Sequence, residues 1–365
     1  MIEIDLHPKW TWKHDLTHYI ISGVAKLFYP NFEVTGHENL PKKGEPVIYV
    51  LNHHNFLLDG LMLWVGLNRE TSCLGKSTFF GHPISRLALE TFRAIPIYRK
   101  KDDGQPYGPN GDVAERNQFV LAHCRALLHE GKSFVIFPEG TTHSENRLLP
   151  LQAGVARIAL QAEDEADWQR DIKVVPVGVY YEEKTKFRSN VHLVVNRPLS
   201  VQNYKEAYEA DPQQASDSFI AQISKSLIEA WKQANHVETP QFTPITPWQG
   251  IRMLLFLLIS MPLAGFGWLM NYIPYRITEP LVIRYFDKRL TRRATGKMLA
   301  NMILLPLLWI TLAISCSLMF ELVWGGLFLI AAPCMSYLAV RWGEVFQLLV
   351  SQFTFRAKAL IEQRM

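Results

Sequence analysis

A histidine and an aspartate near position 55 are the first residues whose spacing suggests chemistry. His54 and Asp59 are separated by four residues and follow an apolar run, residues 46–51, with the composition of a β-strand. If a helix begins just after His54, the carboxylate returns to within hydrogen-bond reach of the imidazole. Such a carboxylate fixes the ring's tautomer and stabilises the imidazolium formed on proton uptake. The pair predicts a general base, His54, oriented by Asp59, and the adjacent His53 is interpreted as structural.

Polar residues follow two further predicted strands in the same half of the chain. Arg99 follows the run 94–97, and its guanidinium suits a phosphate or a carboxylate. The segment Phe137 to His143 places an acid, a glycine and hydroxyls after a buried run, where main-chain N–H groups can face an anion. The carboxyl ends of parallel strands form one edge of a sheet, so we expect these side chains to converge.

The elements that must position these residues alternate between strand and helix. Strands are expected at 32–40, 46–51, 71–76, 94–97, 133–137, 172–181 and 191–195, and helices at 61–67, 79–92, 112–130, 154–162 and 203–236. This alternation predicts an α/β fold with a largely parallel sheet flanked by helices. The apolar run 174–179 is expected to be core or the wall of a lipid groove.

Composition adds a membrane region to this globular one. Hydrophobic residues make up 48% of the 365 residues, and much of the excess follows position 250. The net charge of +4 is too small to indicate nucleic acid as a partner but fits an anionic membrane surface or phosphorylated substrates. The four cysteines form neither a disulfide framework nor a zinc motif.

Two long uncharged stretches lie in the C-terminal part. Residues 253–270 carry no charge, and residues 299–340 carry only Glu321, which fits two spans turning near Glu321 or the following glycine pair. The basic segment between the stretches should lie on the cytoplasmic side. A single crossing by 253–270 would place it outside, so this stretch is expected to dip into the membrane and return, or to lie in the interface.

The expected domain order follows from these changes in composition. It comprises an N-terminal interfacial helix (1–30), an α/β domain (31–238), a proline-rich linker (239–250), membrane helices (251–345) and a cytoplasmic C-terminal helix (346–365). The N-terminus lacks the pattern of a signal peptide, so we expect an integral membrane protein with its α/β domain on the cytoplasmic face.

Four short blocks in this order resemble the sequence blocks of the glycerolipid acyltransferases. They read NHHNFLLD, AIPIYRK, FPEGTTH and VVPVGV, and the resemblance covers about residues 31–200. It implies that His54 deprotonates an acceptor hydroxyl and that Asp59 orients it. The hydroxyl oxygen then attacks the thioester of acyl-CoA or acyl-carrier protein, without a covalent acyl-enzyme, metal or cofactor.

The resemblance also implies the substrate contacts. Arg99 would hold the acceptor's phosphate, and Glu139, Gly140 and Thr141 would build the acceptor site. Many bacterial lysophosphatidate acyltransferases carry an arginine where this chain has Thr142, and the continuation to Gly154 is similar to the glycerol-3-phosphate and dihydroxyacetone-phosphate branch. The further candidates for phosphate contact are Arg147 and Lys76.

The expected function is therefore membrane-bound transfer of a fatty acyl group to a hydroxyl of glycerol-3-phosphate or a related glycerol phosphate in phospholipid synthesis. The expected partners are membrane lipid, the acyl donor and the acceptor. Acylation of lysophosphatidic acid is the alternative within the family. Two alternatives of other classes are a metal-dependent hydrolase with ligands His53, His54, Asp59 and Glu139, and a non-catalytic membrane scaffold.

Overall fold

The protein consists of two compact units. The computed structural model describes residues 11–67, 69–81, 86, 89–90, 92–102, 112–236, 245–286 and 290–362. The first unit comprises Met1–Val237 together with Leu290–Ala294, and the second comprises Glu238–Arg289 and Thr295–Met365.

An eight-stranded sheet is the centre of the first unit. Its strands are β1 (Asn31–Thr35), β2 (Val47–Leu51), β3 (Thr71–Lys76), β4 (Ala94–Ile97), β5 (Ser133–Ile136), β6 (Lys173–Tyr181), β7 (Asn190–Val195) and β8 (Leu199–Ser200). The order is β1-β7-β6-β2-β5-β3-β4, with β8 on β6. Strands β2 to β6 run parallel, whereas β7 and β8 are antiparallel to β6 and β1 is parallel to β7. The predicted largely parallel sheet is thus confirmed.

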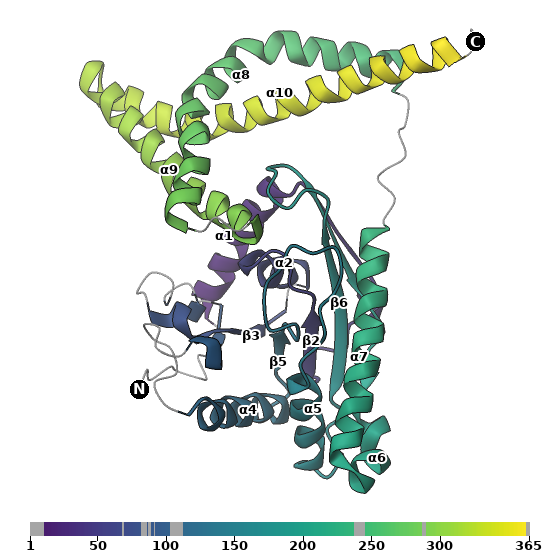
Figure 1. Ribbon diagram of the computed structural model, residues 1–365. Helices are drawn as coiled ribbons and strands as arrows, with labels where there is room; N and C mark the ends of the chain where they lie inside the picture. Colours follow the sequence, from purple (N-terminus) through teal and green to yellow (C-terminus); the bar gives the residue numbers. More distant parts are fainter. Residues whose placement is uncertain are drawn as a thin grey trace. The chain divides into compact units, whose positions relative to one another are not determined.

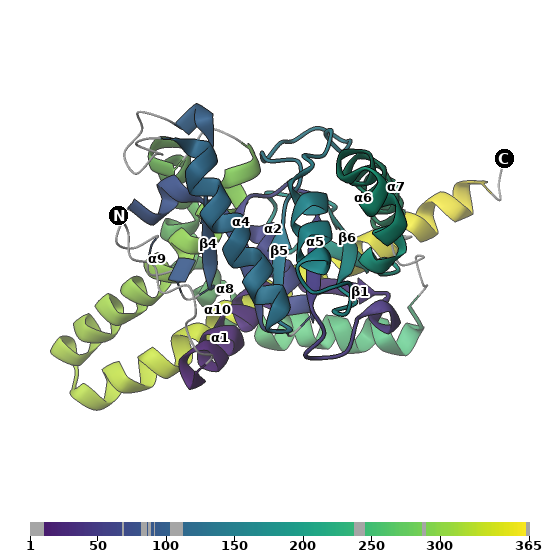
Figure 2. The same cartoon turned by 90° about the horizontal axis from the view of Figure 1, so that it is seen from below.

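Helices cover both faces of this sheet. The α-helices of the first unit are α1 (Trp12–Phe28), α2 (Leu57–Leu67), α4 (Val113–His129), α5 (Gly154–Asp164), α6 (Lys205–Ala210) and α7 (Pro212–Asn235). Helices α4, α5 and α7 pack side by side over a core that includes Ile48, Val174 and Phe219 (Figures 1 and 2). Helix α2 packs on the other face, where a Cβ added at Gly66 would come within 2.9 Å of Phe32.

The apolar run 174–179 forms part of β6 and belongs to the core. Its residues are almost completely buried between β2 and β7. Gly178 lies directly against the main chain of Ala230 in α7, which leaves no room for a side chain. A glycine is required here because helix and strand approach each other closely.

Two expected elements differ from the structure. The helix expected at 203–236 is divided, because the Asp211 side chain accepts the N–H groups of Gln213 and Gln214 and Pro212 begins a new helix. The strand expected at 32–40 ends at Thr35, where Gly36 takes a φ of 80°. Residues 77–81 form a 3₁₀ helix, and much of the helix expected at 79–92 lies outside the described residues.

Helix α1 carries an exposed apolar stripe. Its large apolar side chains at helical spacing are exposed rather than packed, namely Trp12, Leu16, Tyr19, Ile20 and Leu27. A soluble protein gains nothing by exposing such a stripe, so the surface is suited to contact with an apolar environment.

The second unit is built from three long helices, α8 (Pro247–Leu281), α9 (Leu290–Met319, from Thr295 on) and α10 (Leu322–Glu362). The Asn271 amide in α8 connects all three, since it donates to Ser336 Oγ in α10 at 2.7 Å and accepts from Trp309 Nε1 in α9 at 3.3 Å. Polar bonds of this kind and close approach of small residues hold lipid-facing helices to one another.

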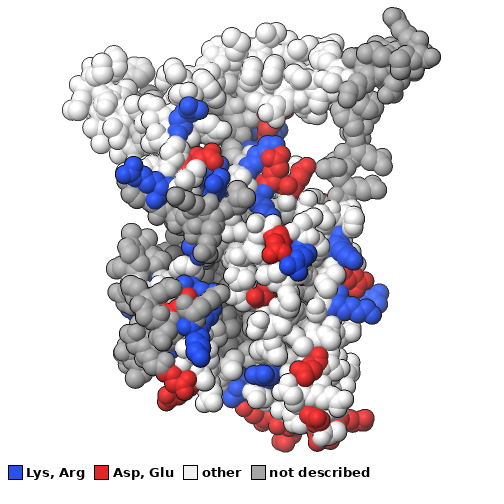
Figure 3. All heavy atoms as spheres, in the orientation of Figure 1, with Lys and Arg blue, Asp and Glu red and all other residues white. Residues whose placement is uncertain are grey.

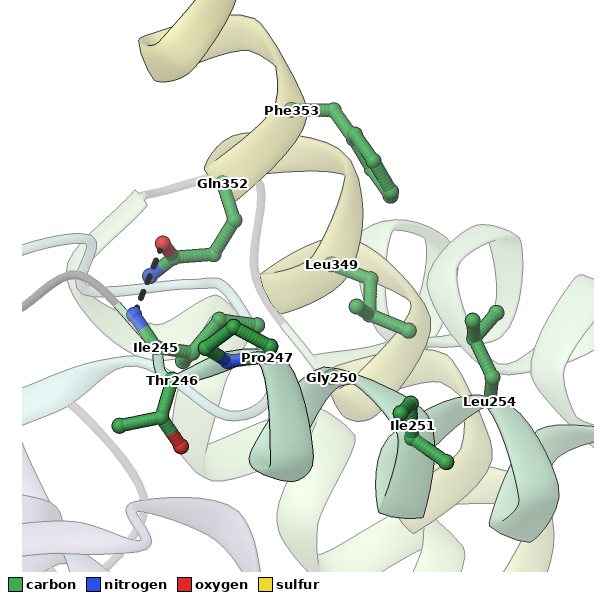
Figure 4. A pocket seen from close by; sticks show the side chains of 9 residues that line it. All are labelled: Ile245, Thr246, Pro247, Gly250, Ile251, Leu254, Leu349, Gln352 and Phe353. Carbon is green, nitrogen blue, oxygen red and sulfur yellow. Dashed lines mark hydrogen bonds between the residues drawn. The ribbon is translucent and has the colours of Figure 1, made fainter.

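The start of α8 lies against the end of α10. Figure 4 shows a shallow pocket there, lined mainly by apolar side chains of the two helices. Gln352 Oε1 accepts the main-chain N–H of Ile245 at 3.2 Å, which fixes the chain just before the helix begins. Of the expected linker at 239–250, residues 239–244 lie outside the described residues.

Each of these three helices is long and apolar enough to span a bilayer, over Pro247–Arg284, Thr291–Met319 and Leu322–Thr354. Figure 3 shows the face over these helices largely without Lys, Arg, Asp or Glu. The turn between α9 and α10 lies at Phe320 and Glu321, as the sequence predicted.

The expectation that residues 253–270 dip into the membrane and return is wrong. Helix α8 is continuous through this stretch, with Pro262 inside it. A proline in a membrane helix is tolerated because neighbouring groups satisfy the freed carbonyl, so it does not force a turn. Helix α10 likewise continues to Glu362, without a break where a separate segment 346–365 was expected.

Candidate active site

The structure corrects the predicted pairing of Asp59. Its Oδ2 accepts from Nδ1 of His53 at 3.0 Å, and not from His54. The same oxygen also accepts the main-chain N–H of Asn55 at 2.8 Å, which fixes the carboxylate at the start of α2. Phe56, the last residue before α2, has a φ of 52°, in the left-handed region.

His53 is held from four directions. Its ring donates to Asp59 and stacks on Phe137 with 4.2 Å between ring centroids. Its N–H donates to Glu139 Oε1 at 2.7 Å, and its carbonyl accepts from the His143 N–H at 3.2 Å. Because Nδ1 carries the proton that is hydrogen-bonded to Asp59, Nε2 keeps its lone pair. This nitrogen makes no hydrogen bond with any residue in the described part of the chain, and 16% of the side chain is accessible.

His54 is instead buried and hydrogen-bonded on both sides of its ring. The Asn52 amide is oriented by the main chain of β6, since its Oδ1 accepts from Val179 N–H and its Nδ2 donates to Val179 O. Nδ2 therefore also donates to His54 Nδ1 at 2.9 Å, and His54 Nε2–H donates to the carbonyl of Arg147 at 3.3 Å. Both ring nitrogens are used by the neutral ring.

Electrostatics agree with this neutral state. Burial, followed by the positive charge of Lys184, lowers the pKa of His54 to about 4, against the opposing effect of Asp59 and Glu139. A histidine with this pKa is a poor proton acceptor near neutral pH. The geometry therefore moves the candidate base from His54 to His53.

The Glu139 side chain connects several segments of the site by hydrogen bonds. Its side chain is fully buried. Oε1 accepts a hydrogen bond from the His53 N–H, and Oε2 accepts from Leu149 N–H at 2.7 Å and from His143 Nε2 at 2.5 Å. Both oxygens thus have partners within the protein. Through these contacts Glu139 joins three segments of the chain.

A tight turn brings Glu139 to this position. Gly140 N–H donates to Phe137 O at 3.1 Å, with Pro138 at the second position of the turn. Gly140 has a φ of 64°, which a side chain would strain. Thr141 follows, half-buried.

Lys76 and Arg99 lie together, because both bind one buried acid. Asp102 accepts from Arg99 through two nitrogens, Nε at 2.7 Å and Nη2 at 3.2 Å, and pairs with Lys76 Nζ at 2.9 Å. Burial favours the protonated acid, but the hydrogen bonds from the two cations outweigh it and lower the pKa of Asp102. Arg99 Nη1 also donates to the carbonyl of Gly140 at 3.4 Å. The predicted convergence of strand ends is therefore observed.

Arg147 does not join that group. Its guanidinium is exposed and binds Glu145 at 2.7 Å, whereas its carbonyl holds His54. The sequence signal for Arg147 was only its position after the glutamate-glycine turn, which does not determine where a long side chain points.

A set of ligand-type atoms suited to a cation lies beside His53. His54, Glu139 and His143 each offer one such atom, all within 4.8 Å of one another. This differs from the ligand set considered from the sequence, since His143 replaces His53 and Asp59. The hydrogen bonds of His54 and the Glu139–His143 contact already use these atoms, so a metal would have to displace those bonds.

Replacing His54 with glutamine should weaken the pH dependence of stability. The folded-state pKa of about 4 lies below the usual value of 6.5, so the unfolded chain binds the extra proton and wild-type stability falls as pH drops from 6.5 to 4. The slope from this one group is at most about 1.4 kcal/mol per pH unit. Denaturant unfolding of both proteins between pH 4 and 7 measures it. If the free energy of unfolding changes with pH in the same way for both proteins, His54 is not a buried neutral group.

Comparisons with known proteins identify similar sequences. Residues 31–180 match the family model described as Acyltransferase. Glycerol-3-phosphate O-acyltransferase 2 of Saccharomyces cerevisiae is 35% identical over 36% of this chain and 17% of its own length. The chloroplastic 1-acyl-sn-glycerol-3-phosphate acyltransferase LPAT1 of Arabidopsis thaliana is 26% identical over 52% of this chain and 50% of its own.

A solved structure is also similar. The 1-acyl-sn-glycerophosphate (LPA) acyltransferase PlsC of Thermotoga maritima shares 17% identity, covering 60% of this chain and 81% of that one, with a TM-score of 0.42. The chain spans half or less of the length of the two curated relatives described above. Over residues 31–180, therefore, this chain is similar to the acyltransferase family, and the relatives described above are named for glycerolipid synthesis.

Proposed function

We propose that the protein transfers a fatty acyl group from acyl-CoA or acyl-carrier protein to a hydroxyl of glycerol-3-phosphate or a closely related glycerol phosphate. The observation that carries this proposal is the fixed His53, oriented by a buried carboxylate, with cations at the neighbouring strand ends. The similarity to a yeast protein named for glycerol-3-phosphate acylation supports the acceptor. The plant relative's name gives lysophosphatidate as the second candidate acceptor.

The reaction needs one base and an oriented nucleophile. His53 Nε2 takes the proton of the acceptor hydroxyl while Asp59 stabilises the imidazolium. The oxygen bonds to the thioester carbonyl carbon, the carbon–sulfur bond breaks, and the thiolate leaves and recovers the proton. Lys76 and Arg99, which lie together on Asp102, are cations suited to the phosphate. No step of this proposal uses a metal or a bound cofactor.

Purified protein with labelled acyl-CoA and a panel of acceptors tests the activity. We expect transfer to glycerol-3-phosphate, and weaker or no transfer to lysophosphatidate, in the presence of a chelator as well as in its absence. If none of glycerol-3-phosphate, dihydroxyacetone phosphate and lysophosphatidate is acylated, the proposal fails. Activity that disappears with the chelator would instead assign a metal to the His54, Glu139 and His143 set.

Replacement of the two adjacent histidines distinguishes their roles. His53→Ala should lower kcat by about 10²- to 10⁴-fold in the folded protein, because it removes the base, and should also lower the melting temperature, because buried Asp59 loses its ring donor. His54→Gln should lower the melting temperature more but retain activity within about tenfold of wild type. The control is His37→Ala, an exposed histidine. Equal loss of kcat in both site variants, or an active His53→Ala protein, would contradict the assignment.

We propose that the catalytic unit lies on the cytoplasmic face and that α8 lies along the membrane interface. Residues up to Val237 and residues Leu290–Ala294 belong to the same compact unit, in which the Arg292 guanidinium lies 4.8 Å from the Phe56 ring. Both ends of α8 must then be on one side of the membrane, which a single crossing by a continuous helix does not allow. The part of α10 that packs along α8, from Met335 to Gln352, shares this position in the interface. The exposed stripe of α1 provides a further lipid contact.

Cysteine labelling tests this topology. In a background without the four native cysteines, Arg284→Cys and Lys186→Cys should react with a membrane-impermeant maleimide from the same side of sealed vesicles. Vesicles of inverted orientation provide the control, where both should be protected. Labelling of the two positions from opposite sides would show that α8 crosses the membrane.

A further inference from the structure

Strand β6 brings one more segment to the edge where His53 lies. It is a parallel neighbour of β2 with Leu51 opposite Val177, so the two strands end at the same side of the sheet. Beyond this register, the Asn52 side chain holds Val179 at both its N–H and its carbonyl. The loop that follows Tyr181 therefore begins directly beside the histidine segment.

Lys184 lies in this loop, and hydrogen bonds fix its main chain. The Tyr29 hydroxyl donates to the carbonyl of Lys184 at 3.1 Å and accepts from Asn55 Nδ2 at 3.3 Å. Asn55 is the residue whose N–H binds Asp59. A single tyrosine side chain thus separates the main chain of Lys184 from the segment that carries the catalytic pair.

The ammonium of Lys184 is partly removed from water without a direct counter-ion. Among the described residues it makes no ion pair or hydrogen bond, although the side chain is half-buried. Burial lowers the pKa of Lys184, and the charges of Asp59 and Glu139 oppose this. Its charge acts in turn on His54. Lys184 is therefore electrostatically part of the site.

The other cations near the site differ from Lys184. Lys76 and Arg99 share Asp102, and Arg147 is exposed and bound to Glu145. Lys186, two residues beyond Lys184, is also exposed and binds Glu183 at 2.7 Å. An anion entering beside His53 meets two buried carboxylates, and Lys184 is a cation placed to offset them.

We propose that Lys184 binds the phosphate group of the acceptor beside His53 and so contributes to selection of a phosphorylated acceptor. The inference rests on the proposed function. The ligand is a phosphate monoester, which both glycerol phosphate and coenzyme A contain. The acceptor is favoured because its phosphate is only a few bonds from the hydroxyl that His53 deprotonates, whereas the phosphates of coenzyme A are separated from the thioester by the whole pantetheine arm.

Steady-state kinetics of Lys184→Gln test this assignment, with Lys186→Gln as the matched control from the same loop. We expect the KM for glycerol-3-phosphate to rise roughly 10- to 100-fold, the loss typical of a charged hydrogen bond. The KM for acyl-CoA and the melting temperature should change little, and Lys186→Gln should behave as wild type. Lys184→Arg should recover part of the affinity, because it keeps the charge.

The alternative outcomes overturn the proposal in distinct ways. A rise confined to the KM for acyl-CoA would assign Lys184 to the donor. A fall in kcat and melting temperature with both KM values unchanged would show a structural role.

Calorimetric titration with glycerol-3-phosphate alone separates this inference from the proposed function. If wild type binds it more tightly than Lys184→Gln but acylates no acceptor, the proposed function fails while the phosphate site stands. If the two proteins bind it equally, the phosphate site fails.

Discussion

The buried carboxylate of Glu139 is the interaction on which the arrangement of the site depends. It accepts hydrogen bonds from the main-chain N–H groups of His53 and Leu149 and from a ring nitrogen of His143. These bonds join the end of β2 to the loop after β5. A charge in the interior is stable only when such donors satisfy it, and removing one partner would leave the others unpaired. In the mechanism that we propose, the glutamate therefore positions the segment that carries His53.

The charged side chains of the site form two groups. Beside the histidines, Asp59 and Glu139 are buried and Lys184 is the nearby cation without a direct counter-ion among the described residues. At the ends of β3 and β4, two cations share Asp102. In the proposed reaction, a phosphorylated acceptor would meet these two cations, while the Asp59 carboxylate keeps the base in the correct tautomer.

The catalytic unit also constrains the topology that we propose for the membrane region. Because Leu290–Ala294 packs with the catalytic unit, the long apolar helix before it would begin and end on one side. Counting apolar residues suggests a crossing for α8 as readily as for α9 and α10. A position in the interface would satisfy both the helix's apolar surface and the position of its ends, which length alone does not reveal.

Much of the site followed from the sequence. The alternation of strands and helices determined a parallel sheet, and parallel strands necessarily place Lys76, Arg99 and Glu139 at one edge. The sequence could not decide between two adjacent histidines, because neighbouring side chains point in different directions and only the folded loop shows that His53 meets Asp59. Nor could it find Lys184, which reaches the site only because β6 lies beside β2. Local pattern determined which residues are available, and tertiary contacts between segments distant in the chain decided which of them act together.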